Sequence, residues 1–320
     1  DPERLYQPLI SNPVYGYQAV NVESQRRQEN SLLSWTKRII QVRRSTRVFG
    51  RGTIEFLRPA NHRVLAYVRS LNLGCHEMEF VRGVKIGSDT AARIKAKAEE
   101  LDIGLSAHAP YYVNLNSPEA GKRLQSQDHL LRSARAAALC GAKSVVFHAG
   151  YYGMTSPEEA YAAIKREIGQ VLSVLRAERN PVRLRIETMG KASQFGTLDE
   201  VLSLCRELEG LEPCLDFSHL HAREGQVNSY PEFQRVWRKV EKRLGKTGLK
   251  NAHVHISGIE YGPKGELRHL NLPDSDFRYH EWIRAVGEAG IEGHIVCESP
   301  AREVDARMLQ DLYRSFRLKH

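Results

Sequence analysis

Seven short segments rich in β-forming residues alternate with helical stretches from Gly74 to the end of the chain. The expected strands span residues 76–81, 104–108, 144–148, 183–188, 213–217, 252–257 and 294–298. The expected helices span residues 89–102, 125–140, 156–179, 198–208, 230–244, 277–287 and 304–317. The third helix has a clear start, because Ser156 is a good N-cap residue and Pro157 fits the first turn. Strands that alternate with helices indicate parallel strands joined by helical crossovers.

Seven strand–helix units are one short of a (β/α)8 TIM barrel, and an open ring would leave unpaired backbone groups along two edges. We therefore expect an α/β fold, a (β/α)8 TIM barrel whose first strand–helix unit is replaced by the segment before Leu71. Residues 52–57 and 63–68 of that segment are strand candidates, and either can supply the missing strand. A chain of 320 residues with 41% hydrophobic residues suits one such domain with a smaller appendage.

The first 70 residues differ in character, with a loop-rich stretch followed by a helix expected over residues 31–44. Their motifs are Asp1-Pro-Glu-Arg-Leu-Tyr6, Pro13-Val-Tyr-Gly-Tyr-Gln-Ala-Val-Asn-Val-Glu23, Ser31-Leu-Leu-Ser-Trp35 and Val48-Phe-Gly50. This stretch resembles the end of the catalytic domain of trehalose synthases, in the α-amylase superfamily. The catalytic carboxylates of that family lie upstream of the matching stretch, so the resemblance does not imply trehalose synthesis. We expect a trehalose-synthase-like arm of loop, helix and β-hairpin over residues 1–70, and the barrel over residues 71–320.

Composition narrows the compartment and the kind of partner. The formal net charge of +9 favours a polyanionic partner such as nucleic acid. The five cysteines are odd in number and widely spaced, without a Cys-x-x-Cys pair, which favours buried thiols in a reducing compartment. No apolar run approaches the roughly 20 residues that span a bilayer. We expect a cytoplasmic monomer that does not associate with a membrane.

Histidine and carboxylate side chains lie at or just after the C-terminal ends of six expected strands. They are His108, His148, Glu187, Asp216 with His219, His253 with His255, and Glu298. In a parallel barrel these ends converge on one face, where active sites lie. A single strand-end histidine is more often an ordinary hydrogen-bonded residue, and the chance that it binds a metal is roughly one in five. Six together favour a metal cluster, because charged groups at the ends of apolar strands are costly unless paired or ligated.

The motifs around these residues resemble those of endonuclease IV, notably its archaeal-type members, from about Leu71 to near the C-terminus. The motifs are Leu105-Ser-Ala-His108-Ala-Pro-Tyr-Tyr-Val-Asn-Leu115, Phe147-His148-Ala-Gly-Tyr-Tyr152, Ile186-Glu187-Thr188, Leu215-Asp216-Phe-Ser-His219 and His255-Ile-Ser-Gly. The resemblance implies a TIM barrel with up to three zinc ions, and manganese is the alternative metal. It implies that His108 and His148 hold one ion and that Glu187 bridges it to a second. Asp216, His255 and Glu298 would complete the second site, and His219 would bind the third ion.

The other ligands of the third ion are a departure from the family pattern. The family commonly supplies an Asp and a His two residues later, whereas this loop reads Gly265-Glu266-Leu-Arg-His269-Leu. Glu266 and His269 are the candidates, because Leu267 cannot bind a metal. Strand alternation places His253 on the same side as His255, so His253 is the substitute if the strand register differs. His76 and His221 also lie near the motifs.

Contacts to DNA are expected from loops at the rim of the barrel. The candidates for base stacking and phosphate contact are Arg82, Tyr111, Tyr112, Tyr151, Tyr152 and Lys264. Ordinary packing or solvation of these side chains is an equally good interpretation. The first strand and first loop of the family, which normally help to grip DNA, are replaced here by the trehalose-synthase-like segment.

The resemblance implies hydrolysis of damaged double-stranded DNA on the 5′ side of an abasic site, leaving a 3′ hydroxyl. In that reaction divalent ions bind the phosphate, and Glu187 and Glu298 are the catalytic candidates that orient the attacking water or bridge the metals. A metal-dependent sugar isomerase or epimerase is the first alternative, because related barrels use strand-end Glu, Asp and His around one or two metals. The second alternative is a fusion protein that binds metal without catalysis. Five candidate histidine ligands and the positive charge favour phosphodiester chemistry.

Overall fold

The computed structural model describes residues 21–26, 67–80 and 83–318, together with residues 31, 33, 34, 36, 37 and 40. The chain forms two compact units, Asp1–Arg58 and Pro59–His320. In the first unit, α1 spans Val22–Arg26, and residues 33, 34, 36, 37 and 40 are helical, in agreement with the helix expected from residue 31. The strand candidate at residues 52–57 lies outside the described residues.

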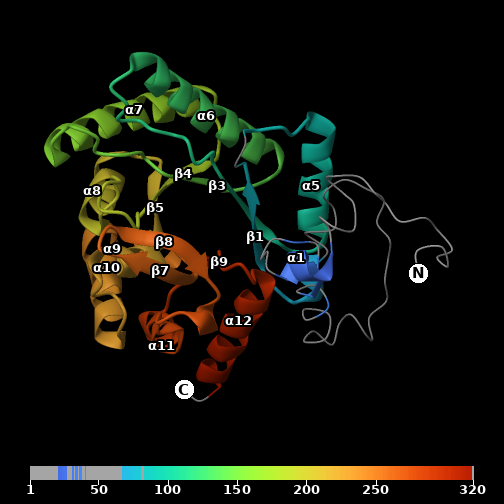
Figure 1. Cartoon of the computed structure of the whole chain (residues 1–320). Coiled ribbons are helices and arrows are strands. Elements are labelled where there is room, and N and C mark those ends of the chain that lie inside the picture. Colours follow the sequence, from blue (N-terminus) through green and yellow to red (C-terminus); the bar gives the residue numbers. More distant parts are fainter. Residues whose placement is uncertain are drawn as a thin grey trace. The chain divides into compact units, whose positions relative to one another are not determined.

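The second unit is built on a parallel sheet whose strands follow one another around a barrel (Figure 1). The strands are β1 (Cys75–Glu79), β2 (Gly104–His108), β3 (Ser144–Phe147), β4 (Arg183–Glu187), β5 (Leu211–Asp216), β6 (Ala252–Ile256) and β9 (Gly293–Cys297). They pair in the order β1-β2-β3-β4-β5-β6-β9, and every pair is parallel. All seven expected strands are confirmed, as is the α/β barrel class.

The barrel is nearly closed between its first and last strands. The thiol of Cys75 on β1 lies 3.6 Å from the carbonyl oxygen of Ile295 on β9, to which it donates. Within the described residues no eighth strand stands between these two. The expected strand at residues 63–68 is wrong at its end, because Tyr67 and Val68 are helical, as are the two residues that follow them. The remainder of that candidate lies outside the described residues.

Helices cover the outside of the barrel and confirm the seven expected after Gly74 (Figure 1). They are α5 (Ser88–Glu100), α6 (Ala120–Leu139), α7 (Pro157–Ala177), α8 (Leu198–Glu207), α10 (Tyr230–Lys250, broken at Gly245), α11 (Tyr279–Ala289) and α12 (Glu303–Arg317). The start of α7 forms as expected, because Ser156 and Glu159 cap each other's backbone N–H groups in a capping box. Among the described helices, none is both long and apolar enough to cross a membrane.

Two features near the strand ends were not expected from the sequence. Helix α9 (Phe217–Glu224) begins directly after β5, and strands β7 (Gly258–Gly262) and β8 (Gly265–Leu270) form an antiparallel hairpin after β6. A short 3-10 helix, η2 (Leu272–Asp274), follows the hairpin. Both α9 and the hairpin extend from the C-terminal ends of strands, where the sequence predicts the metal ligands.

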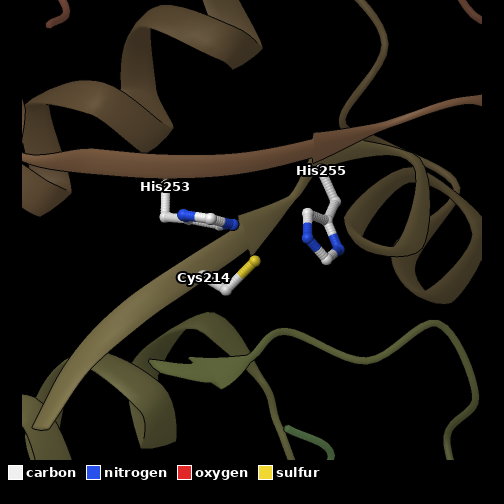
Figure 2. Close-up of side chains that lie close together, drawn as sticks. All are labelled: Cys214, His253 and His255. Carbon is white, nitrogen blue, oxygen red and sulfur yellow. The ribbon is translucent and has the colours of Figure 1, made fainter. Parts of the chain in front are cut away.

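Alternate residues of each strand face the barrel interior and the surrounding helices. On β6, His253 and His255 point to the same side, toward Cys214 of β5 (Figure 2). Ser106 of β2 and Arg185 of β4 are also buried and polar. TIM barrel interiors are usually filled by branched apolar side chains, so this interior is unusually polar.

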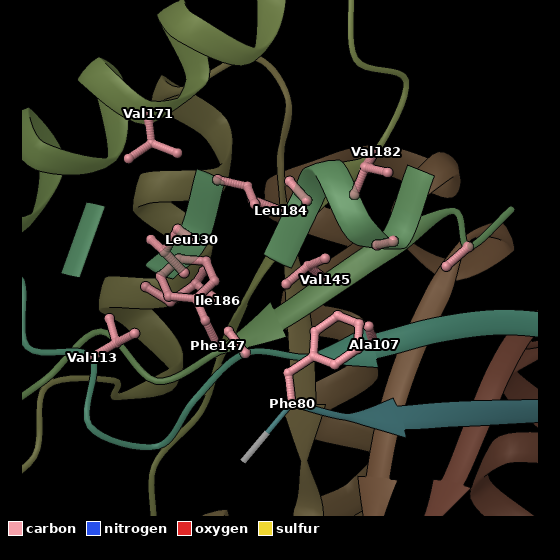
Figure 3. Packing of buried hydrophobic residues seen from close by; sticks show 14 of the residues in the cluster. Phe80, Ala107, Val113, Leu130, Val145, Phe147, Val171, Val182, Leu184 and Ile186 are labelled. Atoms are coloured by element: carbon pink, nitrogen blue, oxygen red, sulfur yellow. The ribbon is translucent and has the colours of Figure 1, made fainter. Parts of the chain in front are cut away.

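The intervening residues pack outward against the helices. Leu184 and Ile186 of β4 belong to one hydrophobic cluster with Leu130 of α6 and Val171 of α7 (Figure 3). A second cluster packs around Phe217, Trp237 and Trp282 under α9, α10 and α11. This apolar shell fixes the strands, and the strands in turn fix the polar side chains at their ends.

Candidate metal centre

The structure brings together the predicted ligands of six different strands. His108, Glu187 and Asp216 are the last residues of β2, β4 and β5. His148 and Glu298 follow β3 and β9 directly, and His255 is the fourth residue of β6. Since the sheet is parallel throughout, all these side chains lie at one end of the barrel. The convergence that was expected from the sequence is therefore present.

Glu187 lies at the centre of the group, and its two carboxylate oxygens face different imidazoles. Its Oε2 lies 3.2 Å from Nε2 of His108 and 3.0 Å from Nε2 of His148. Its Oε1 lies 3.3 Å from Nδ1 of His255 and 3.2 Å from Nδ1 of His219. The other nitrogen of His108 is 2.7 Å from the carbonyl oxygen of Ala109, so a proton there leaves Nε2 free as a ligand. Glu187 has the geometry of a carboxylate that bridges two sites.

Asp216 ends β5 and also caps α9, which fixes His219 beside it. Its Oδ1 accepts a hydrogen bond of 2.7 Å from the backbone N–H of His219. Its Oδ2 is buried without a hydrogen-bond partner among the described residues, and lies 3.3 Å from Nδ1 of His219. A buried carboxylate oxygen with no donor is costly, and a cation at this position would satisfy it.

The hairpin supplies Glu266 and His269, and a β-bulge explains how both reach the site. Tyr261 pairs with Glu266 and Glu260 pairs with Arg268, so Leu267 is an extra residue without an opposite partner. The bulge shifts the alternation of β8, which brings residues three apart to the same side. The Nε2 atoms of His269 and His219 are 3.4 Å apart, and Oε2 of Glu266 lies 3.5 Å from Nε2 of His219. The unusual spacing of this pair is thus compatible with one shared site.

Burial and neighbouring charges shift the pKa values in this cluster. Burial alone lowers the pKa of His108, but its contact with Glu187 raises it to about 9. Burial likewise opposes charge on His219, yet Asp216 and Glu187 raise its pKa to about 10. Burial raises the pKa of Glu298 to about 7, whereas His148 and His255 hold the pKa of Glu187 well below its usual range against the effect of burial. Protons on His108 and His219 therefore balance the carboxylate charge wherever no metal does, whereas burial lowers the pKa of His148.

The chemistry and spacing of the donors fit zinc. Three groups have ligand atoms within 4.8 Å of one another: His108 with His148 and Glu187; Glu187 with Asp216, His255 and Glu298; and Asp216 with His219 and His269. Two ligands of a tetrahedral zinc ion lie about 3.3 Å apart, because each is about 2.0–2.1 Å from the metal. The closest contacts in the cluster, from 3.0 to 3.5 Å, match that spacing. These residues can hold metal, and Glu187 and Asp216 each belong to two groups.

Two carboxylates of β1, Glu77 and Glu79, also lie at the site, and neither was among the ligands predicted from the sequence. Glu77 is buried and contacts both histidines of β6, and the ligand oxygens of Glu77, Glu79 and Glu298 lie within 4.8 Å of one another. A cavity of about 1400 Å³ between β1 and β9 is lined partly by these three residues. Acidic residues two apart in an expected strand were the available signal, because alternation places them on one face.

The other histidines near the motifs have different contacts. His253 shares the side of His255, as expected (Figure 2). Its Nε2 lies 2.9 Å from Oε2 of Glu77. His221 pairs with Asp276, at 3.2 Å between Nε2 and Oδ2. Among the described residues, the close metal-type groups do not include His76 or His221. The register expected for β6 therefore places His255, rather than His253, in the cluster.

The rim candidates fall into two kinds. Tyr111 is 43% exposed and its ring lies 4.9 Å from that of His108, so it stands at the mouth of the cluster. Tyr112 and Tyr151 are exposed, and Lys264 is exposed at the tip of the hairpin. Tyr152 instead donates to Glu200 and packs on Phe195, which is the ordinary packing interpretation. Arg82 lies outside the described residues.

Comparison with known proteins places the chain in a family. The model of the xylose isomerase-like TIM barrel family matches residues 65–317. The chain belongs to this family. An uncharacterized protein of Methanocaldococcus jannaschii is 43% identical over 267 residues, which cover 83% of this chain and 96% of that protein. A probable endonuclease 4 of Mycoplasma pneumoniae is 28% identical, over 62% of this chain and 68% of that protein.

Solved structures support the same barrel. Endonuclease IV from Thermus thermophilus has a TM-score of 0.64 at 19% identity, covering 81% of this chain and 94% of that one. A D-tagatose 3-epimerase-like protein has a TM-score of 0.61 at 15% identity, covering 79% and 93%. The similarity to trehalose synthases is also found, at 53% identity to the enzyme of Pimelobacter sp. over 70 residues. Those residues are 22% of this chain but 12% of that enzyme.

Proposed function

We propose that this xylose isomerase-like barrel is a metal-dependent phosphodiesterase that cleaves double-stranded DNA on the 5′ side of abasic sites. The observation that carries the proposal is the third group of donors, in which His219 and His269 face each other with Glu266 beside them. One or two metals around Glu187, Asp216, His255 and Glu298 do not need these side chains. A site for up to three zinc ions suits a phosphate group with several oxygens to bind. The likeness to probable endonuclease 4 proteins points the same way.

The proposed roles follow from position. His108 and His148 would hold one zinc ion, Glu187 would bridge to a second ion held by Asp216, His255 and Glu298, and His219, His269 and Glu266 would hold the third. Divalent ions bound there would neutralise charge on the scissile phosphate and make a water molecule a stronger nucleophile. Manganese is the alternative metal for this donor set.

The residues of the chain contribute orientation. Glu187 and Glu298 flank His255 and would orient the attacking water by accepting its hydrogen bonds. Tyr111, beside the cluster, is placed to pack against an exposed sugar or base next to the scissile bond.

The test is incision of a duplex oligonucleotide that carries one abasic analogue. Zinc-loaded protein is compared with an EDTA-treated sample, with Glu187→Gln, and with Glu178→Gln as a matched control. The carboxylate of Glu178 pairs with Arg135 away from the cluster. We expect incision by the wild type and the control only, with a 5′ fragment that a polymerase can extend from its 3′ hydroxyl. Protein that contains zinc but does not incise the duplex would refute the proposal.

A specific observation also favours a second candidate, a metal-dependent sugar isomerase or epimerase. Glu187, Asp216, His255 and Glu298 form a compact group that would hold a single metal between two glutamates. Epimerases are among the similar folds. The His269→Ala variant separates the two candidates, because it removes a donor of the third group and leaves the four-residue group intact. Loss of incision supports the nuclease, whereas conversion of D-tagatose or D-fructose by wild type and variant alike supports the epimerase.

A further inference from the structure

A buried carboxylate of β1, Glu77, lies one layer below the proposed ligands. In the register of β1 and β2, Glu79 is opposite His108 and Glu77 is opposite Ser106. The side chain of Glu77 is 1% exposed. Charged carboxylates are seldom buried unless their oxygens are paired, so the partners of Glu77 indicate why it is retained.

Each oxygen of Glu77 has a defined neighbour in the barrel interior. Its Oε2 accepts a hydrogen bond of 2.7 Å from the hydroxyl of Ser106 and lies 2.9 Å from Nε2 of His253. Its Oε1 lies 2.8 Å from Nε2 of His255. That last contact is an ion pair without hydrogen-bond geometry. Ser106 and His253 fix the carboxylate, and the carboxylate faces His255.

The two ring nitrogens of His255 face opposite parts of the site. Nδ1 lies 3.3 Å from Oε1 of Glu187 and 3.3 Å from Oε1 of Glu298. Nε2 lies against Glu77. An imidazole that binds a metal through one nitrogen carries its proton on the other, and a carboxylate beside that proton orients the ring and strengthens the ligand.

We infer that Glu77 is a positioning residue for the metal centre. Its negative charge, 2.8 Å from Nε2, keeps the proton of His255 on that nitrogen, so that the lone pair of Nδ1 faces the group formed with Glu187 and Glu298. The inference rests on the metal centre of the proposed function and does not depend on its DNA substrate. A purely structural role for Glu77 predicts a different result, in which the fold weakens and the metal affinity is unchanged.

Cobalt binding separates these roles. Metal-stripped wild type, Glu77→Gln and Glu167→Gln are titrated with Co²⁺ and followed by visible absorption. Glu167 is the matched control, because it is a buried carboxylate of α7 that pairs with Arg166 at 2.9 Å, in the helix layer away from the metal centre. We expect Glu77→Gln to bind cobalt about 10-fold to 100-fold more weakly, with a changed absorption spectrum, as for other partners of ligand histidines. The control should keep the wild-type affinity and spectrum even if it melts at a lower temperature.

A folded Glu77→Gln protein with wild-type cobalt affinity and spectrum would overturn the inference. Circular dichroism establishes the folding of each variant before titration. If Glu77→Gln does not fold, Ser106→Ala carries the test, because it removes only the hydroxyl that fixes Glu77. A several-fold weaker affinity is then expected, and an unchanged one overturns the inference. Wild type that binds no cobalt or zinc would refute the metal centre itself, whereas bound metal without incision refutes only the DNA substrate.

Discussion

The Glu187→Gln substitution tests the electrostatics of the cluster directly, through the titration of His108. In metal-free protein, burial lowers the pKa of His108 and the Glu187 carboxylate, 3.2 Å away, raises it to about 9. The difference from the ordinary value of 6.5 corresponds to about 3 kcal/mol, at roughly 1.4 kcal/mol per pH unit. Glutamine keeps the shape of the side chain and removes its charge. We therefore expect His108 to titrate below about 7 in the variant, because burial then outweighs the remaining carboxylates.

The measurement is a pH titration of the imidazole signals in long-range ¹H–¹⁵N NMR spectra of metal-stripped protein. Since the folded pKa of His108 is raised, its contribution to stability is fully present below pH 6.5 and is lost as the pH rises through about 9. The His108 part of the stability difference between wild type and variant should thus be about 3 kcal/mol near pH 6 and vanish above about pH 9. Glu178→Gln should leave the titration unchanged. A His108 pKa that stays near 9 in Glu187→Gln would refute the reasoning.

Three further predictions concern metal, stoichiometry and backbone. Zinc must displace protons from His108 and His219, whose pKa values are raised to about 9 and about 10, so zinc affinity should increase as the pH rises from about 6 to about 9. Calorimetry in buffers of different ionisation enthalpy counts the released protons. A zinc affinity that does not change with pH would contradict this prediction. His269→Ala should lower the zinc content by one ion in elemental analysis and reduce incision by more than about 10-fold, while an unchanged zinc content would remove His269 from the site. Gly265→Ala should lower the free energy of unfolding by about 1–3 kcal/mol, because Gly265 has φ +93° and a Cβ there would lie 2.1 Å from the carbonyl oxygen of Gly190. Gly262→Ala is the control, because a Cβ at Gly262 would have its nearest contact at 3.8 Å. Equal denaturant midpoints for the two variants would contradict the strain argument.

The strands and the location of the site were predictable because both depend on short-range signals. Several strands contain a brief apolar run with a ligand at or just after the end, as with Glu187 after Leu184 and Ile186. Parallel strands place their C-terminal ends on one face whatever the details of packing. Six residues could therefore be expected to converge before any distance was known.

The features that the sequence did not reveal depend on contacts between elements. Helix α9 was not predicted, because Asp216 is both the last residue of β5 and the N-cap of the helix, so no turn separates the strand from the helix. The bulge at Leu267 depends on pairing with β7, and the spacing of Glu266 and His269 alone gave no sign of it. Glu77 lies within a strand rather than at its end, and its partners Ser106 and His253 come from β2 and β6.

The polar interior of the barrel is better explained by function than by stability. Arg185 of β4 is buried, and it bonds to the carbonyl oxygens of Pro213 and Asn251 and pairs with Glu212. Buried ion pairs are often no more stable than apolar side chains of the same volume, although the removal of one partner costs about 3–5 kcal/mol. A barrel selected for stability alone has no need of them. These contacts instead link β4 and β5 to the residue that precedes β6. Glu187, Asp216 and His255 lie at or near the C-terminal ends of these three strands. Together with Glu77 on β1, they would fix the depth and rotation of the strands below the ligands, and the proposed metal centre, in which ligand atoms of one zinc ion lie about 3.3 Å apart, would require that rigidity.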